Sequence, residues 1–143
     1  MSNLMKKKGD KKLLHQSIAS GIGLGVSAVL LLIVFILTLT YLEKLENTLV
    51  PMLESMEKAV NDEDFEKVNA MSKDVLKLLS DAEQRLQLFS SHYDIEQLMN
   101  AARLLVRIGT EGDVTAYMTG ITNIRSWVGF IRENNRLTIG IIV

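Results

Sequence analysis

The sequence contains no cysteine, one proline, one tryptophan and two histidines among its 143 residues. The lack of cysteine excludes disulfide bonds, a cysteine nucleophile, thiolate metal sites and a lipidated cysteine anchor. His15 and His92 lie on opposite sides of a long apolar run, so we expect no site that needs two histidines. The length leaves room for one modest domain and excludes most multidomain enzymes.

Charge is missing from a long stretch near the start. Residues 13–42 carry no formal charge, and residues 22–42 read IGLGVSAVLLLIVFILTLTYL. As a helix those 21 residues would be about 32 Å long, which matches a hydrocarbon core of about 30 Å. We predict one transmembrane helix at residues 17–42, between a basic stub at residues 1–16 and an outer domain at residues 43–136. The alternative is a cleaved signal peptide, although LTLTYLEKLE offers no A-x-A-like cleavage site.

The charges flanking this stretch differ in sign. Residues 1–42 have a net charge of +4, and residues 43–143 have a net charge of −5. The basic charges of the first part are Lys6, Lys7, Lys8, Lys11 and Lys12. By the positive-inside rule they predict a membrane protein with a cytoplasmic N-terminus and an extracytoplasmic C-terminal domain. The lysines also suit contact with anionic membrane lipid. The negative charge of the outer domain disfavours nucleic acid as a partner, because phosphates are also negative.

Small residues recur every four positions in the first half of the apolar stretch, at Ser17, Gly21 and Gly25. Such a stripe lets another helix approach closely, so it predicts packing against a second copy or against another membrane protein. The alternative is that glycine is simply more frequent in membrane helices.

After the apolar stretch, hydrophobic residues recur at helical spacing in four segments. They run from Leu42 to Ala59, from Phe65 to Phe89, from Ile95 to Leu105 and from Val114 to Ile131. Four such stripes joined by short turns favour an antiparallel arrangement. The predicted fold is all-α: a single N-terminal transmembrane helix followed by an antiparallel bundle of three to four amphipathic helices.

Local signals predict where these helices begin and end. Pro51 lies inside the first stripe and predicts a kink or a fresh start near Val50. We expect the second helix to run from about residue 64 to 91. Asp94 has the spacing of a capping box with Gln97.

The last helix has its own predicted limits. Asp113 is the expected N-cap, and Asn134 and Asn135 mark the expected end. An apolar tail then remains at residues 137–143, for packing on the bundle, pairing with a partner or touching lipid.

Few residues suggest chemistry. His92, Asp94 and Glu96 lie in a turn next to a helix start, which is poor geometry for converging on a metal. Ser90, His92 and Asp94 are too close in sequence for a nucleophile, a base and an orienting group. We therefore expect no enzyme activity, cofactor or metal, and we identify no small-molecule substrate. The arginines between Arg103 and Arg136 form either an anion site or a solvated face that balances the acids.

Four short segments resemble a bacterial family known only as a domain of unknown function. They are the run AVNDEDFEKV at residues 59–68, FSSHYDI at 89–95, Arg103 with Leu104, and Asp113 with Ala116 three positions later. The resemblance implies one membrane helix, an exported helical domain and a short apolar tail. It also implies that the protein lies in the cell membrane of a spore-forming bacterium and that its gene lies near genes for multi-pass membrane proteins. The family has no established activity, so the resemblance implies none for this chain. The chain departs from the pattern at Phe65, where the family has tryptophan, and at Gly140, where it has asparagine.

Two function hypotheses follow. The first is a single-pass, non-enzymatic interaction or accessory subunit of a membrane complex. The second is an extracytoplasmic ligand-sensing four-helix bundle that signals through a partner, because the short stub holds no signalling domain of its own.

Overall fold

The computed structural model describes the backbone of residues 2–142 and the side chains of residues 23–136. The chain forms α1 (Ser2–Asn61), α2 (Phe65–Leu86), α3 (His92–Ile108), the short 3-10 helix η1 (Gly109–Glu111) and α4 (Val114–Ile142). No strand occurs among residues 2–142. The predicted all-α class is therefore confirmed, with a long apolar N-terminal helix followed by a helical bundle.

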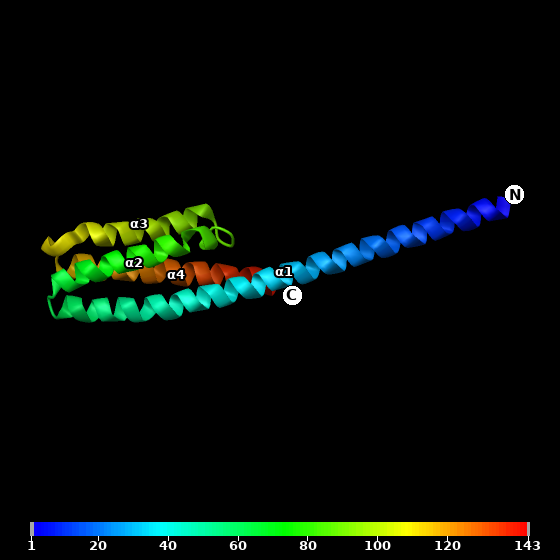
Figure 1. Ribbon diagram of the computed structural model, residues 1–143. Coiled ribbons are helices and arrows are strands. Elements are labelled where there is room, and N and C mark those ends of the chain that lie inside the picture. Colours follow the sequence, from blue (N-terminus) through cyan, green and yellow to red (C-terminus); the bar gives the residue numbers. More distant parts are fainter. Residues whose placement is uncertain (1, 143) are drawn as a thin grey trace. The chain divides into compact units, whose positions relative to one another are not determined.

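The chain divides into two compact units, one ending at Leu37 and the other beginning at Thr38. The second unit is a bundle of residues 38–61 of α1 with α2, α3 and α4, which lie side by side in Figure 1. Short turns make α1 and α2, α2 and α3, and α3 and α4 antiparallel neighbours. The fourth side of the bundle is closed between α1 and α4.

Two ion pairs fix the pairing of α1 with α4. Arg125 Nη1 lies 2.8 Å from Glu57 Oε1, and Arg132 Nη1 lies 2.6 Å from Glu46 Oε1. The later residue of α4 thus pairs with the earlier residue of α1, so these two helices are also antiparallel. All four charged groups are partly exposed, so each pair contributes at most about 1 kcal/mol and mainly sets register.

The core is the set of apolar stripes that the spacing predicts. Every fourth or third residue of each helix is buried, and the largest fully buried side chains are Tyr117, Leu49, Leu53, Met56, Leu79, Leu86, Ile95, Leu98, Met99, Leu105, Ile121 and Ile124. Gly120 belongs to this packing, since a Cβ there would lie 2.7 Å from Leu105 Cδ1 of α3. Apolar burial of this extent is the main force holding the four helices together.

Three helix ends are capped by side chains. Lys67 N donates to Asp64 Oδ1 at 3.1 Å, and Ala116 N donates to Asp113 Oδ1 at 2.7 Å. At the start of α3 the cap is Ser91, whose Oγ accepts from Asp94 N at 3.1 Å. The predicted capping role of Asp94 is therefore wrong: Asp94 lies inside the first turn, where its charge favours the partly positive helix end.

Other predicted limits also change. The helix α1 is continuous through Pro51, which is exposed, so no fresh helix starts at Val50. The helix α2 ends at Leu86 rather than near residue 91, because residues 87–90 form the turn to α3.

The two ends of the bundle's chain differ from the prediction as well. The helix α4 does not stop at Asn134 and Asn135 but continues to Ile142, so the backbone of 137–142 is helix and not a separate tail. Thr38 and Leu42, assigned above to the transmembrane segment 17–42, are buried in the bundle unit. The bundle thus begins five residues before residue 43, the predicted start of the outer domain.

Candidate functional site

The segment of α1 before the bundle exposes a continuous apolar surface. Ten large apolar side chains there are between 47% and 73% exposed: Leu24, Val26, Val29, Leu30, Leu31, Leu32, Ile33, Val34, Ile36 and Leu37. Residues 29–34 are consecutive, and at 100° per residue they cover the whole circumference of the helix. The surface therefore has no polar face to turn toward water.

Within the residues whose side chains are described, one helix is long and apolar enough to cross a membrane, counted from Gly23 to Asn61. The part from Thr38 on belongs to the bundle, so the exposed portion ends at Leu37. Residues 17–37 without charge would give about 32 Å of helix. The membrane-crossing length survives the change of boundary, since the five residues taken by the bundle are offset by uncharged residues before Ile22.

Of the predicted small-residue stripe Ser17, Gly21 and Gly25, only Gly25 lies among the residues whose surroundings the structure describes. A side chain at Gly25 would meet nothing within 4 Å, and the same holds for Gly23. The side chains of Ser17 and of Lys6, Lys7, Lys8, Lys11 and Lys12, and the surroundings of Gly21, lie outside the described part, although the backbone there is helical.

The bundle has one end at which α1 enters, which we call the entry end. It consists of the start of the bundle part of α1, the α2–α3 turn at residues 87–91, and α4 near Asn135. Buried Asn135 Nδ2 donates to Ser90 Oγ at 3.2 Å and to Ile131 O at 2.8 Å. The guanidinium of Arg85 lies 5.4 Å from the centre of the Tyr41 ring. These contacts tie α4, the turn, α2 and α1 together at this end.

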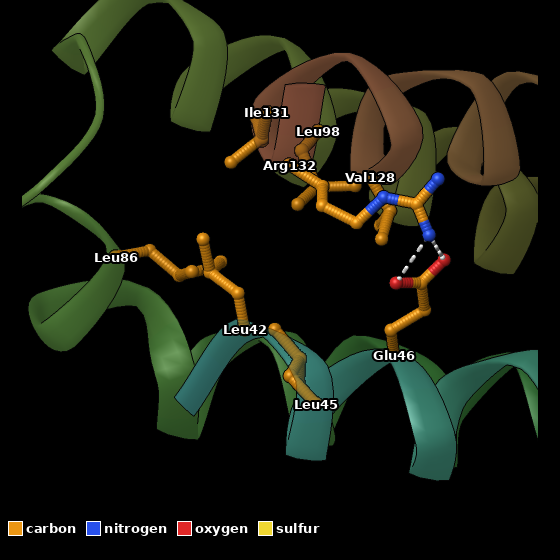
Figure 2. A pocket seen from close by; sticks show the side chains of 8 residues that line it. All are labelled: Leu42, Leu45, Glu46, Leu86, Leu98, Val128, Ile131 and Arg132. Carbon is orange, nitrogen blue, oxygen red and sulfur yellow. Dashed lines mark hydrogen bonds and ion pairs between the residues drawn. The ribbon is translucent and has the colours of Figure 1, made fainter. Parts of the chain in front are cut away.

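A small cavity lies just inside the entry end, between Leu42, Leu86 and Ile131 (Figure 2). Its volume is about 10 Å³, close to the least that a single water molecule needs. Arg132 Nη1 lies 2.6 and 2.8 Å from the two carboxylate oxygens of Glu46, and Figure 2 shows this pair among the lining residues. The cavity is a small packing gap with an ion pair in its wall.

The opposite end, which we call the far end, is built around Tyr117. Its hydroxyl donates to Gly109 O, and its ring stacks on Phe65 at 5.8 Å between ring centres. Burial raises the pKa of Tyr117 above its ordinary value of 10.0, because the phenolate would lose its water shell. The exposed turns around it carry Asp62, Glu63, Asp64, Glu66, Glu111 and Asp113. Lys58, Lys67 and Arg107 are exposed near the same turns, so acids outnumber bases at this end without being alone there.

The residues examined for chemistry are accounted for by structure. Ser90 accepts from Asn135, Ser91 caps α3, and His92 is exposed at the first residue of α3. Among residues 23–136, no group of three or more His, Asp or Glu side chains could hold a metal ion.

The arginines mostly serve ion pairs. Arg125 and Arg132 contact acids of α1, and Arg136 lies 3.7 Å from Glu133. They form the solvated, charge-balancing face that was one of the two predicted roles. Sequence reasoning missed the buried role of Asn135, which it treated as a helix end because asparagine is a common terminator.

Comparison with known proteins gives one match. The family model described as "Domain of unknown function (DUF4363)" matches residues 36–142. No curated protein and no solved structure matches the chain significantly. The matched range starts two residues before Thr38, the first residue of the bundle unit, so the family model covers the bundle and leaves out most of the exposed apolar segment.

Proposed function

Because the chain belongs to the DUF4363 family, whose description assigns no activity, we propose its role from its own residues. The protein is a single-pass, membrane-anchored helical protein that acts as a non-enzymatic interaction or accessory subunit of a membrane complex. The observation that carries this proposal is the apolar surface around the full circumference of α1 between Leu24 and Leu37.

Energy favours lipid as the surrounding of that segment. Moving ten large apolar side chains from about half exposure into hydrocarbon is worth on the order of 10 kcal/mol. That equals the whole free energy of folding of a typical small domain. A protein partner on one side would leave the other faces of residues 29–34 in water, whereas lipid covers all of them.

The orientation follows from the charges. Five lysines precede the apolar segment, whereas the bundle has a net charge of −5 if counted from residue 43. We propose that the N-terminus is cytoplasmic and the bundle is outside, in a bacterial cell membrane.

The contact within the membrane is the small-residue stripe Ser17, Gly21 and Gly25. At Gly25 nothing lies within 4 Å, so a second helix has free access to the backbone there. Close approach of helices along such a stripe supplies the packing that associates helices in lipid. The partner is another membrane protein or a second copy of this chain.

A paired substitution tests this contact. The double variant Gly21→Leu/Gly25→Leu places two bulky side chains on the stripe, whereas the control Gly23→Leu places one on a different face of the same helix. We expect the complex purified in mild detergent to fall to the monomer mass in the double variant and to keep its mass in the control. A wild-type chain that purifies as a lone monomer, or equal behaviour of the two variants, would contradict the proposal.

The ligand-sensing alternative stays a prediction without an observation in its favour. The cavity at the entry end holds at most about one water molecule. A thermal-shift screen of the full chain in detergent with small metabolites would reveal such a ligand.

A further inference from the structure

The outer face of α3 exposes large apolar side chains. Tyr93 and Leu104 are 63% and 56% exposed, and at 100° per residue they lie within about 20° of each other on the helix. Between Thr38 and Leu86, by contrast, every large apolar side chain of α1 and α2 is at least partly buried. The exposed apolar side chains of the bundle's helices are therefore found on α3 and α4.

Charge is divided along the same face of α3. The first half of the helix carries Asp94 and Glu96, and the second half carries Arg103 and Arg107. None of the ion pairs formed among residues 23–136 involves these four side chains. Arg103 Nη1 donates instead to the neutral amide oxygen of Asn100, at 3.1 Å. The acidic half and the basic half of α3 can therefore both pair with charges of another molecule.

Aromatic rings of α4 border one edge of the face. Phe130 is 48% exposed, and its ring packs edge-to-face on Trp127 at 5.6 Å between ring centres. Gly120 of α4 lies against Leu105, so the edge of α3 next to Leu104 is the one that borders α4. This edge of the face supplies apolar contact area.

The opposite edge carries charge. Glu96 and Arg103 are seven residues apart, so they lie within about 20° of each other and about 80–100° from Leu104 on the helix. Both charged side chains are exposed. The face thus has an apolar edge beside α4 and a charged edge away from it.

A second copy of the chain complements this face when a two-fold axis crosses α3 close to Asn100. Each α3 then runs antiparallel to its copy, and Glu96 of one chain lies beside Arg103 of the other on the charged edge. A parallel alignment of the two α3 helices would instead set Glu96 beside Glu96 and Arg103 beside Arg103. Opposite charges across an interface favour the antiparallel alignment.

The same axis brings Arg107 of each chain to the level of Tyr93 of the other. A guanidinium attracted to the face of an aromatic ring stabilises such a contact. The bundle already contains one example, since the guanidinium of Arg85 lies 5.4 Å from the centre of the Tyr41 ring. Arg107 and the exposed ring of Tyr93 therefore give the pair a second polar contact.

Apolar groups also match across the axis. Because Gly120 lies against Leu105 and α4 is antiparallel to α3, Phe130 is level with Ile95. The axis brings Leu104 of the second copy to within one residue of that level. A two-fold axis at right angles to α3 keeps the α4 edges of both copies on the same side, so Leu104 of each chain meets the ring of Phe130 of the other.

The size of the face suits a dimer. The 17 residues of α3 span about 25 Å, and α3 with its flanks is about 20 Å wide. Each copy would therefore contribute roughly 500 Å², or about 1,000 Å² for the pair, which is close to the least that a specific interface needs.

We propose that two copies of the chain associate through the outer faces of α3, antiparallel about Asn100, with Glu96 of each paired to Arg103 of the other. The contact lies within the bundle, so it goes beyond the membrane contact proposed above and does not rest on it.

Disulfide crosslinking of the full chain in mild detergent tests the arrangement. The chain has no cysteine, so the variant Asn100→Cys carries a single thiol, placed next to the axis. Ser55→Cys, at an exposed position of α1, is the control. We expect oxidation to give a disulfide-linked dimer from Asn100→Cys and not from Ser55→Cys. Absence of the linked dimer from Asn100→Cys, or equal linking of the two variants, would overturn the proposal.

Charge reversal separates a second copy from any other partner. In the Asn100→Cys background, Glu96→Arg alone or Arg103→Glu alone sets like charges across the axis, so we expect the linked fraction to fall about fivefold. The double variant Glu96→Arg/Arg103→Glu again sets opposite charges across the axis and should regain the original fraction. This recovery would also exclude misfolding as the cause of the loss.

A double variant that stays as low as the single variants would show that these charges do not pair across a two-fold axis, and the proposal would be wrong. The membrane contact is separated by Gly21→Leu/Gly25→Leu in the same Asn100→Cys background. We expect the linked dimer to persist there, so that failure of the membrane contact leaves the α3 contact standing. Loss of the linked dimer in that variant would contradict an independent contact through α3.

Discussion

Tyr117 makes the most constrained polar contact of the far end. Its buried hydroxyl donates to Gly109 O. Tyr117→Phe leaves that carbonyl without its partner, so we expect the free energy of unfolding to fall by about 1–2 kcal/mol. The measurement is urea unfolding of the full chain in nanodiscs, followed by fluorescence of Trp127, the single tryptophan. The control Tyr93→Phe changes an exposed ring and should leave the midpoint unchanged; equal effects would remove the special role of Tyr117.

The same tyrosine predicts a pH dependence. Burial raises its pKa in the folded state above 10.0, so the unfolded chain releases the proton first as pH rises. The stabilising contribution is fully present below about pH 10, and it is lost as pH rises from there through the folded pKa. We expect wild type to lose more unfolding free energy than Tyr117→Phe when pH rises from about 9 to about 11. Parallel curves for the two proteins would contradict the raised pKa.

Two glycines should respond in opposite ways to alanine. Gly109 has φ 63° and ψ −163°, a backbone region that alanine reaches only with strain of about 1–3 kcal/mol. Gly129 lies inside α4 with open space around its Cα, where alanine favours helix by up to about 1 kcal/mol. Gly109→Ala should lower the urea midpoint and Gly129→Ala should raise it. A shift in the same direction for both would be inconsistent with this backbone geometry.

At the scale of the helices, the sequence predicts that each helix exists and which of its faces is buried better than it predicts the residues at which the helix begins and ends. Asp113 caps α4 as predicted, and Asp64 caps α2 with the same spacing, each accepting a bond from the backbone N–H three residues later. At the start of α3 the N-cap is Ser91 and not Asp94, because α2 already ends at Leu86 and α3 therefore begins at His92. Asn135 is polar but buried, and its side-chain amide donates a hydrogen bond to Ser90 Oγ of the α2–α3 turn. Such long-range partners have no signal in local spacing.

The boundary between the exposed apolar segment and the bundle is also difficult to predict from the sequence. Leu42 is apolar and so suits either lipid or a protein core. The predicted segment 17–42 and the observed start of the bundle at Thr38 therefore differ by residues that hydrophobicity cannot sort. The full-circumference exposure up to Leu37 becomes visible only when the bundle partners are placed. The apolar run itself was evident from the absence of charge.

Pro51 tests how α1 tolerates a break in its hydrogen bonding. The helix continues through it, and proline has no N–H for the carbonyl of Asn47. Because Pro51 is exposed and makes no core contact, Pro51→Ala should raise the unfolding free energy by about 1–3 kcal/mol. Ser55→Ala, one turn further on the same helix, is the control and should gain about 0.5 kcal/mol or less. Equal gains would indicate that the carbonyl of Asn47 already has another donor.

At the scale of the whole molecule, charge and apolar surface point the same way along the chain. Basic residues precede the apolar segment, and the part of the chain that follows it, residues 43–143, has a net charge of −5. Anionic lipid attracts the first group and repels the second. The anchoring that we propose is supported by the apolar segment, and the orientation is supported by the charges on either side of it.

The orientation is testable with the lysines. Changing Lys6, Lys7, Lys8, Lys11 and Lys12 to glutamine removes the charge that, in our proposal, holds the N-terminus in the cytoplasm. The bundle also contains five lysines, and changing those to glutamine is the matched control. With alkaline phosphatase fused after residue 143, which is active only outside the cytoplasm, we expect activity from wild type and from the control, and a clear loss from the N-terminal variant. A second fusion carries a reporter that is active only in the cytoplasm. If that fusion is active and the wild-type phosphatase fusion is inactive, the orientation is the reverse and the acidic bundle lies inside the cell.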